Sequence, residues 1–173
     1  MVKKIITLIF MVVFLSCEKG QNNIDNNKLI SEKKTINAVL DNWHKNASES
    51  KYDLYFDAMA ANSVFIATDA KENWNKKDFE VFSKPFFDRG KAWDFKPIKR
   101  NVYVSANGNT AWFDELLDTW MGVCRGSGVL SKTDDTWKIE QYVLSVTVPN
   151  THIIDVIAIK KELDSVFLSK LNQ

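Results

Sequence analysis

Residues 93–148 alternate between apolar and polar side chains, and this pattern constrains the fold more than any other feature of the chain. A period of two is typical of strands that bury one face. Asn107-Gly108 is a strong hairpin signal, because both residues tolerate a positive φ, and Asp134-Asp135 is a second turn signal. The pattern therefore predicts four consecutive strands, at residues 94–106, 109–119, 123–132 and 136–148.

Before this stretch the apolar residues recur at helical spacing. Residues 31–47 predict a helix capped by Ser31, a second and shorter helix follows, and residues 64–67 predict a short strand. Asn75 opens a third helix that ends at Gly90, with an internal Pro85 that is expected to kink it or to end its regular part early. Because helices precede a run of strands, the predicted fold class is α+β, a curved antiparallel sheet wrapped as a cone around the N-terminal helices.

The two ends of the chain have different compositions. Lys3 and Lys4 precede an apolar run at residues 5–15, which is too short to span a bilayer but is typical of an export signal. We therefore expect a signal peptide at residues 1–16, and a polar, Asn-rich tether at residues 17–32. At the other end, residues 150–173 predict an amphipathic helix that packs on the outer sheet or pairs with a second chain.

Cys17 follows a small residue at the end of the apolar run, where a bacterial lipoprotein is cut and lipidated. The run resembles such a lipoprotein signal, and an ordinary cleaved signal is the alternative. The resemblance implies a protein anchored to a membrane through lipid on Cys17, in the bacterial cell envelope on its periplasmic or surface side. Cys124 is then the remaining thiol, so no disulfide within the chain is expected.

Composition limits the classes of partner. A formal charge of +1 gives no electrostatic basis for binding nucleic acid, so no nucleic-acid partner is expected. Two His and two Cys without metal-ligand spacing predict no metal site, and no cofactor motif is present. The six Trp and eleven Phe are unusual, because aromatic side chains at this density build cores and also line pockets for apolar or aromatic ligands.

Four segments in this order resemble one known family: residues 38–44 (AVLDNWH), 79–93 (FEVFSKPFFDRGKAW), 111–115 (AWFDE) and 137–139 (WKI). Together they resemble the SnoaL-like branch of the nuclear transport factor two-like superfamily, over residues 33–149. The resemblance implies a cone-shaped, cystatin-like roll and a family range from isomerases, cyclases and hydrolases to non-catalytic binding modules. Relatives often carry His in the last strand where this chain has Gln141 and Val143.

The two hairpin turns predict which residues face the interior of the cone. A two-residue turn at 107–108 pairs Arg100 with Glu115 on the inner face, where a buried carboxylate needs such a partner. A two-residue turn at 134–135 pairs Gly128 with Gln141 and directs Gln141 inward, beside the empty volume that Gly126 and Gly128 leave. A slip of one residue in this second register would reverse the facing.

These facings predict a cavity with aromatic walls and a few polar groups. For each aromatic residue the alternative is plain core packing, and for Glu115 with Arg100 it is a structural ion pair. The predicted walls are Trp43, Tyr55, Phe56, Phe79, Phe82, Phe86 and Trp93, and the polar groups are Glu115, Arg100, Gln141 and Tyr142.

Two functions of different class follow from this cavity. The first is a non-catalytic module that binds a small apolar or aromatic ligand, or that presents its outer sheet face to a partner such as a second copy in a homodimer. The second is an enzyme of isomerase or hydrolase type with Glu115 as general base, which requires a raised pKa and a free carboxylate oxygen. The two hypotheses differ in whether Glu115 keeps a free oxygen or is held by Arg100.

Overall fold

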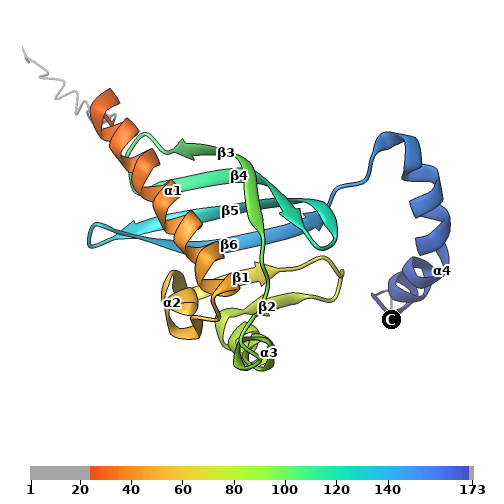
Figure 1. The fold of residues 1–173 in the computed structure, drawn as a ribbon. Coiled ribbons are helices and arrows are strands. Elements are labelled where there is room, and N and C mark those ends of the chain that lie inside the picture. Colours follow the sequence, from red (N-terminus) through yellow and green to blue (C-terminus); the bar gives the residue numbers. More distant parts are fainter. Residues whose placement is uncertain (1–23, 172–173) are drawn as a thin grey trace, which may run out of the picture.

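A computed structural model of the protein describes residues 24–171. The predicted signal peptide, Cys17 and the first residues of the predicted tether lie outside this range. The chain forms three helices and two short strands in its first half, then four longer strands and a C-terminal helix (Figure 1). The elements are α1 (Asn26–Ser48), α2 (Tyr52–Asp57), β1 (Met59–Ile66), β2 (Asn73–Asn75), α3 (Lys76–Asp88), β3 (Lys96–Val104), β4 (Thr110–Thr119), β5 (Gly122–Thr133), β6 (Thr136–Val146), η1 (Asn150–His152) and α4 (Ile153–Leu171).

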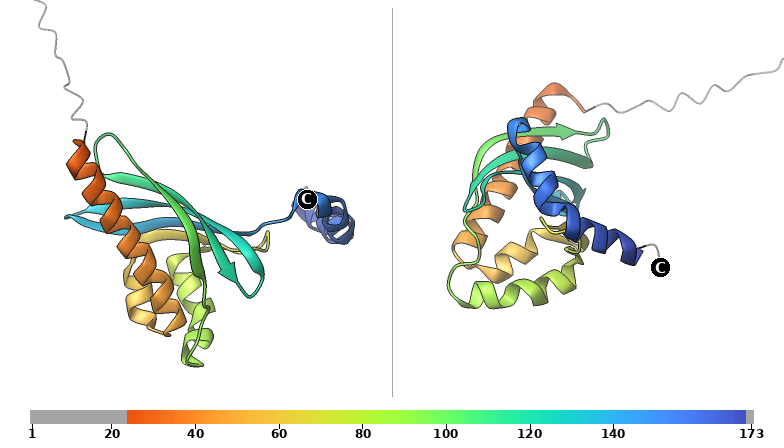
Figure 2. Two further views of the ribbon diagram at one scale, coloured as in Figure 1. Left: turned by 45° about the horizontal axis from the view of Figure 1, so that its top comes forward. Right: turned by 90° about the vertical axis from the view of Figure 1, so that its right-hand side faces the viewer.

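All six strands form one sheet in the order β2-β1-β6-β5-β4-β3. The pairs are antiparallel except for β1 with β6, which run parallel. The sheet is curved, and α1, α2 and α3 lie on the same side of it (Figure 2). The core lies between these helices and the concave face of the sheet. The predicted α+β class and the cone of sheet around N-terminal helices are confirmed.

Helix α1 begins earlier than the sequence pattern predicts. Its N-cap is Asp25, which accepts hydrogen bonds from the backbone of the first turn, so Ser31 is an internal residue. The last part of the predicted tether, residues 26–32, is therefore helical. Contacts with the sheet stabilise these turns, because Glu32 accepts hydrogen bonds from Lys132 Nζ and Trp137 Nε1, each at 2.7 Å.

Helix α3 follows the prediction at both ends but not in its middle. Asn75 caps it as expected, and its side chain accepts a hydrogen bond of 3.0 Å from the Asp78 backbone. Gly90, just beyond it, has the positive φ of 84° expected of a helix stop. Pro85 lies inside the helix and does not end it. The carbonyl that Pro85 leaves unpaired belongs to Val81, which is on the exposed side of the helix, where water can satisfy it.

The two hairpins differ in how well their registers match the prediction. Arg100 pairs with Glu115 as expected, although the β3–β4 loop is wider than two residues. Asp134 and Asp135 form the predicted two-residue turn, each with a positive φ, and Leu130 pairs with Ile139. The next pair, however, is Val129 with Gln141. Glu140 is therefore an extra residue in β6, which forms a β-bulge and reverses the facing beyond it.

The predicted C-terminal helix is confirmed as α4, which stands apart from the rest of the chain (Figures 1 and 2). It follows an extended segment that ends at Pro149, and within residues 24–171 it packs mainly against η1. None of its residues is buried. No helix within the described range is both long and apolar enough to span a membrane.

Candidate functional site

Glu115 lies in the interior of the cone, as its place in β4 predicts. Alternate residues of β4 face inward, so Glu115 shares the concave face with Phe113 and Leu117 and has no exposed surface. A carboxylate in such a place is stable only if donors replace the water that it has lost. Its donors come from helix α1, which packs on this face, and from strands β3 and β6.

Three side chains bind the two oxygens of Glu115. Its Oε2 accepts a hydrogen bond of 2.8 Å from Arg100 Nε on β3. Its Oε1 lies 2.7 Å from His44 Nε2 on α1 and accepts a hydrogen bond of 3.0 Å from the hydroxyl of Tyr142 on β6. Neither oxygen is left free. We call these four residues the Glu115 cluster.

The Glu115 cluster also joins the sheet to α1. Arg100 Nη1 donates to Asp41 Oδ1 at 2.7 Å and to the side-chain oxygen of Asn37 at 3.2 Å. Asn37, Asp41 and His44 are four and three residues apart, so they lie on one side of α1. One Arg side chain therefore connects two residues of the helix to a buried carboxylate of the sheet.

The contacts set the protonation states in the cluster. Burial alone would raise the Glu115 pKa, but the hydrogen bond and charge of His44 and the charge of Arg100 outweigh it and lower this pKa from its ordinary value. The pKa of Tyr142 is raised well above its ordinary value by burial and by the neighbouring Glu115 charge. At neutral pH Glu115 is thus an ionised acceptor and Tyr142 a protonated donor. A general base needs an accessible oxygen and a pKa near the working pH, and Glu115 has neither.

Tyr142 occupies the place that the sequence pattern assigned to Gln141, and this corrects the predicted facing. Because Glu140 forms a bulge, Gly128 pairs with Tyr142 rather than with Gln141, and Gly126 pairs with Leu144 rather than with Val143. Gln141 is partly exposed on the opposite face of the sheet. The pairing of β6 with β1 is irregular at the same point, since its register shifts between the Met59 and Val64 pairs.

The volume predicted beside the two strand glycines is filled. A methyl group on Gly126 would lie 2.2 Å from the hydroxyl oxygen of Tyr142. One on Gly128 would lie 2.3 Å from the backbone oxygen of Gln141 and 2.9 Å from a ring carbon of Phe113. These glycines therefore allow aromatic rings, and at Gly128 also the backbone of β6, to approach β5 closely, rather than leaving space for a ligand.

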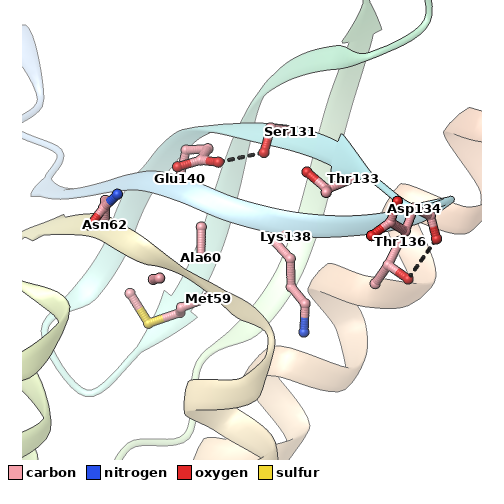
Figure 3. A pocket seen from close by; sticks show the side chains of 10 residues that line it. Met59, Ala60, Asn62, Ser131, Thr133, Asp134, Thr136, Lys138 and Glu140 are labelled. Atoms are coloured by element: carbon pink, nitrogen blue, oxygen red, sulfur yellow. Dashed lines mark hydrogen bonds between the residues drawn. The ribbon is translucent and has the colours of Figure 1, made fainter.

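A polar groove of about 550 Å³ lies on the outer side of the sheet, beside the paired strands β1 and β6 (Figure 3). Glu140, the bulge residue, points to this side and accepts a hydrogen bond from Ser131. Lys138, two residues earlier, pairs with Asp57 of α2 at 3.7 Å. These two charged side chains, Glu140 and Lys138, thus have partners within the chain.

The predicted aromatic walls divide into two groups, and the first is plain core. Trp43, Tyr55, Phe56 and Phe79 are each at most 3% exposed. Trp43 stacks on Tyr55 with ring centroids 4.8 Å apart. Trp43 and Tyr142 form an edge-to-face pair with ring centroids 4.7 Å apart. These rings fill the space where the sequence predicted an enclosed cavity.

The second group, Phe82, Phe86 and Trp93, lines an open cleft of about 200 Å³ beside α3. We call it the aromatic cleft. Phe82 is 39% exposed and Trp120, which projects from the turn between β4 and β5, is 84% exposed. The complete lining is Phe65, Ala67, Thr68, Glu72, Trp74, Phe79, Phe82, Phe86, Ala92, Trp93, Phe95, Trp120, Met121 and Leu144.

Sequence reasoning missed several residues of both sites. His44 is one of them: it is 4% exposed and binds Glu115. Its spacing from Leu40 and Ala47, both buried, could have indicated an inward position. Trp120 and Met121 form an apolar pair in a tight turn, where polar residues are the norm, and that contrast signals a binding surface.

Other chemistry is limited within the described range. Residues 24–171 contain no group of three or more His, Cys, Asp or Glu side chains that could hold a metal ion. Cys124 is a free, buried thiol.

The family model for the SnoaL-like domain matches residues 36–149. The chain belongs to the SnoaL-like domain family. No curated protein gives a significant match to it. Among solved structures, an NTF2-like protein of unknown function from Pseudomonas putida KT2440 has a TM-score of 0.58 and 11% identity, and the match covers 70% of this chain and 90% of that chain.

Two similar structures carry names that suggest enzymes. One, from the NTF2-like family of Streptomyces avermitilis, is described as a candidate dehydratase; it has a TM-score of 0.60 and 10% identity, with 70% of this chain and 99% of that chain covered. The other, from Novosphingobium aromaticivorans, is described as a candidate aromatic ring hydroxylase; it has a TM-score of 0.57 and 14% identity, with 69% and 92% covered. At such identities the likeness establishes the fold alone.

Proposed function

We propose that this SnoaL-like domain is a non-catalytic binding module that takes a small apolar or aromatic ligand in the aromatic cleft. The observation that carries the proposal is the exposure of Phe82 and Trp120, because large aromatic side chains left open to water around a concave surface are typical of binding sites.

The arrangement of the rings favours a flat ligand. Phe82 stacks on Trp74 with centroids 4.4 Å apart and an interplanar angle of 24°, and Trp93 stacks on Phe79 at 5.9 Å and 23°. A planar guest can continue such stacks with an offset. The volume of about 200 Å³ suits one or two fused rings rather than a larger molecule.

The alternative, an isomerase or hydrolase with Glu115 as general base, has no support from this geometry. Both oxygens of Glu115 are occupied by donors, its pKa is lowered, and it does not line the aromatic cleft. The cluster is better explained as a structural connection between α1 and the sheet.

A matched pair of variants on α3 tests the binding proposal. Ligands such as indole should raise the melting temperature of the full chain, and Phe82→Ala should abolish this rise. Val81→Ala, which changes an exposed neighbour outside the cleft lining, should preserve it. An equal ligand effect in both variants would mean that binding occurs elsewhere.

We also propose that lipid on Cys17 holds the domain in the bacterial cell envelope. The support is the sequence pattern of residues 1–17. In cells, Cys17→Ser should move the protein from the membrane fraction to the soluble fraction, and retention of the variant in the membrane would contradict the proposal.

A further inference from the structure

Helix α4 carries an apolar stripe that is largely open to solvent within residues 24–171. Val156, Ile159, Leu163 and Val166 follow one another at intervals of three, four and three residues. Ile159 and Leu163 are 77% and 74% exposed. We call these four residues the α4 stripe. Exposure of such residues in an ordered helix indicates an interaction surface.

The spacing of the α4 stripe is that of a coiled coil. Alternating intervals of three and four place Val156 and Leu163 at a positions and Ile159 and Val166 at d positions of a heptad repeat. Lys170 takes the next a position, where a single Lys helps to fix register. Other faces of α4 also carry exposed apolar residues, such as Ile154 and Leu168, but charged residues such as Lys161 and Asp164 interrupt them.

We propose that α4 pairs in parallel with α4 of a second copy of this chain. The charges beside the stripe favour this partner and this direction. Asp155 occupies a g position and Lys160 the e position five residues later. In a parallel pair, Asp155 of each copy lies opposite Lys160 of the other, whereas an antiparallel pair would bring the acidic g positions Asp155 and Glu162 together.

Part of the α4 stripe borders an open groove rather than packed side chains. Leu163 and Val166 border a groove of about 610 Å³ between α4 and the β1–β2 loop, and Figure 2 shows α4 lying away from the sheet. Within its own chain, Lys160 pairs with Asp164 at 3.4 Å and Asp155 with His152 at 3.3 Å. Both pairs are exposed, so exchanging them for pairs between copies changes the free energy little.

Disulfide cross-linking of the full chain tests the parallel register. In a parallel pair the two copies of residue 159 face each other, so Ile159→Cys should form a covalent dimer under mild oxidation. Lys161→Cys, on an outward face of the same helix, is the matched control and should form no covalent dimer. Equal cross-linking of both variants, or of neither, would overturn the proposal.

Sedimentation of the full chain in mild detergent tests the same contact without cross-linking. Leu163→Glu should abolish the dimer, whereas Leu168→Glu, which changes an exposed leucine outside the stripe, should leave it intact. Asp155→Lys alone should weaken association about tenfold, and adding Lys160→Asp should restore it. A dimer that persists in Leu163→Glu, for instance through the outer sheet face, or a chain that is monomeric throughout, would refute α4 pairing.

Discussion

Replacing Gly126 with alanine should destabilise the domain, because Tyr142 already occupies the space that the new methyl group needs. That methyl carbon would lie 2.2 Å from the Tyr142 hydroxyl oxygen and 3.0 Å from Glu115 Cγ. The Tyr142 ring cannot easily move away, because it packs against two other rings. Its centroid lies 4.7 Å from that of Trp43 and 5.6 Å from that of Phe65. Either strand β5 shifts or the hydroxyl leaves Glu115.

Three contributions set the size of the effect. Overpacking of a core costs about 1–3 kcal/mol. Loss of the hydrogen bond from Tyr142 to the buried Glu115 carboxylate costs a further 1.5–3 kcal/mol, roughly, if the hydroxyl is displaced. Alanine offsets about 0.5–1 kcal/mol of this, because glycine weakens a strand interior. A net loss of about 2–3 kcal/mol in the free energy of unfolding is expected, or a fall of roughly 6–9 °C in melting temperature.

Urea denaturation followed by tryptophan fluorescence measures this loss. Ser127→Ala is the matched control, because residue 127 lies on the same strand with its side chain on the outer face, and its effect should stay within about 0.5 kcal/mol. In the Tyr142→Phe background, where the hydroxyl is gone, Gly126→Ala should cost about 1 kcal/mol less than in the wild type. A Gly126→Ala variant as stable as the wild type would refute the register that the Glu140 bulge produces.

Two further predictions concern the buried carboxylates. The pKa of Glu115 is lowered in the folded state, so its ionised carboxylate stabilises the fold above the ordinary carboxyl pKa of 4.5. This contribution is lost as the pH falls through the folded-state pKa. In a series of denaturation experiments at acidic pH, Glu115→Gln should therefore show a smaller decline in the free energy of unfolding below about pH 4.5 than the wild type. Glu32→Gln should lower the free energy of unfolding by about 2 kcal/mol in a urea titration, because Lys132 and Trp137 lose a charged acceptor. Glu49→Gln, which removes one partner of an exposed ion pair, is the control and should cause no measurable change.

The sequence predicted the architecture well because periodicity and turn chemistry are local. Asn75 and Gly90 delimit a helix through their own backbone preferences, and Asp134-Asp135 forms the predicted turn for the same reason. The Arg100–Glu115 pair followed from one turn and the alternation of strands. Such features need no knowledge of distant parts of the chain.

The interior could not be predicted as well, because it depends on contacts between distant elements. The bulge at Glu140 forms where β6 meets an irregular β1, and no local signal in β6 marks it. Because of this single extra residue, Tyr142 rather than Gln141 faces the core, and its ring occupies part of the predicted cavity. His44 could likewise be recognised as a partner of Glu115 only once α1 was placed on the sheet.

The most direct test of the binding proposal follows the six Trp side-chain N–H signals by NMR during a titration with indole. Trp74, Trp93 and Trp120 line the aromatic cleft, whereas Trp43 and Trp137 are buried in the core and Trp112 lies on the outer sheet face. If the cleft is the binding site, the first three signals shift together with one dissociation constant and the other three stay in place. Shifts confined to the latter three, or no saturable shift for any aromatic or apolar compound tried, would contradict the account.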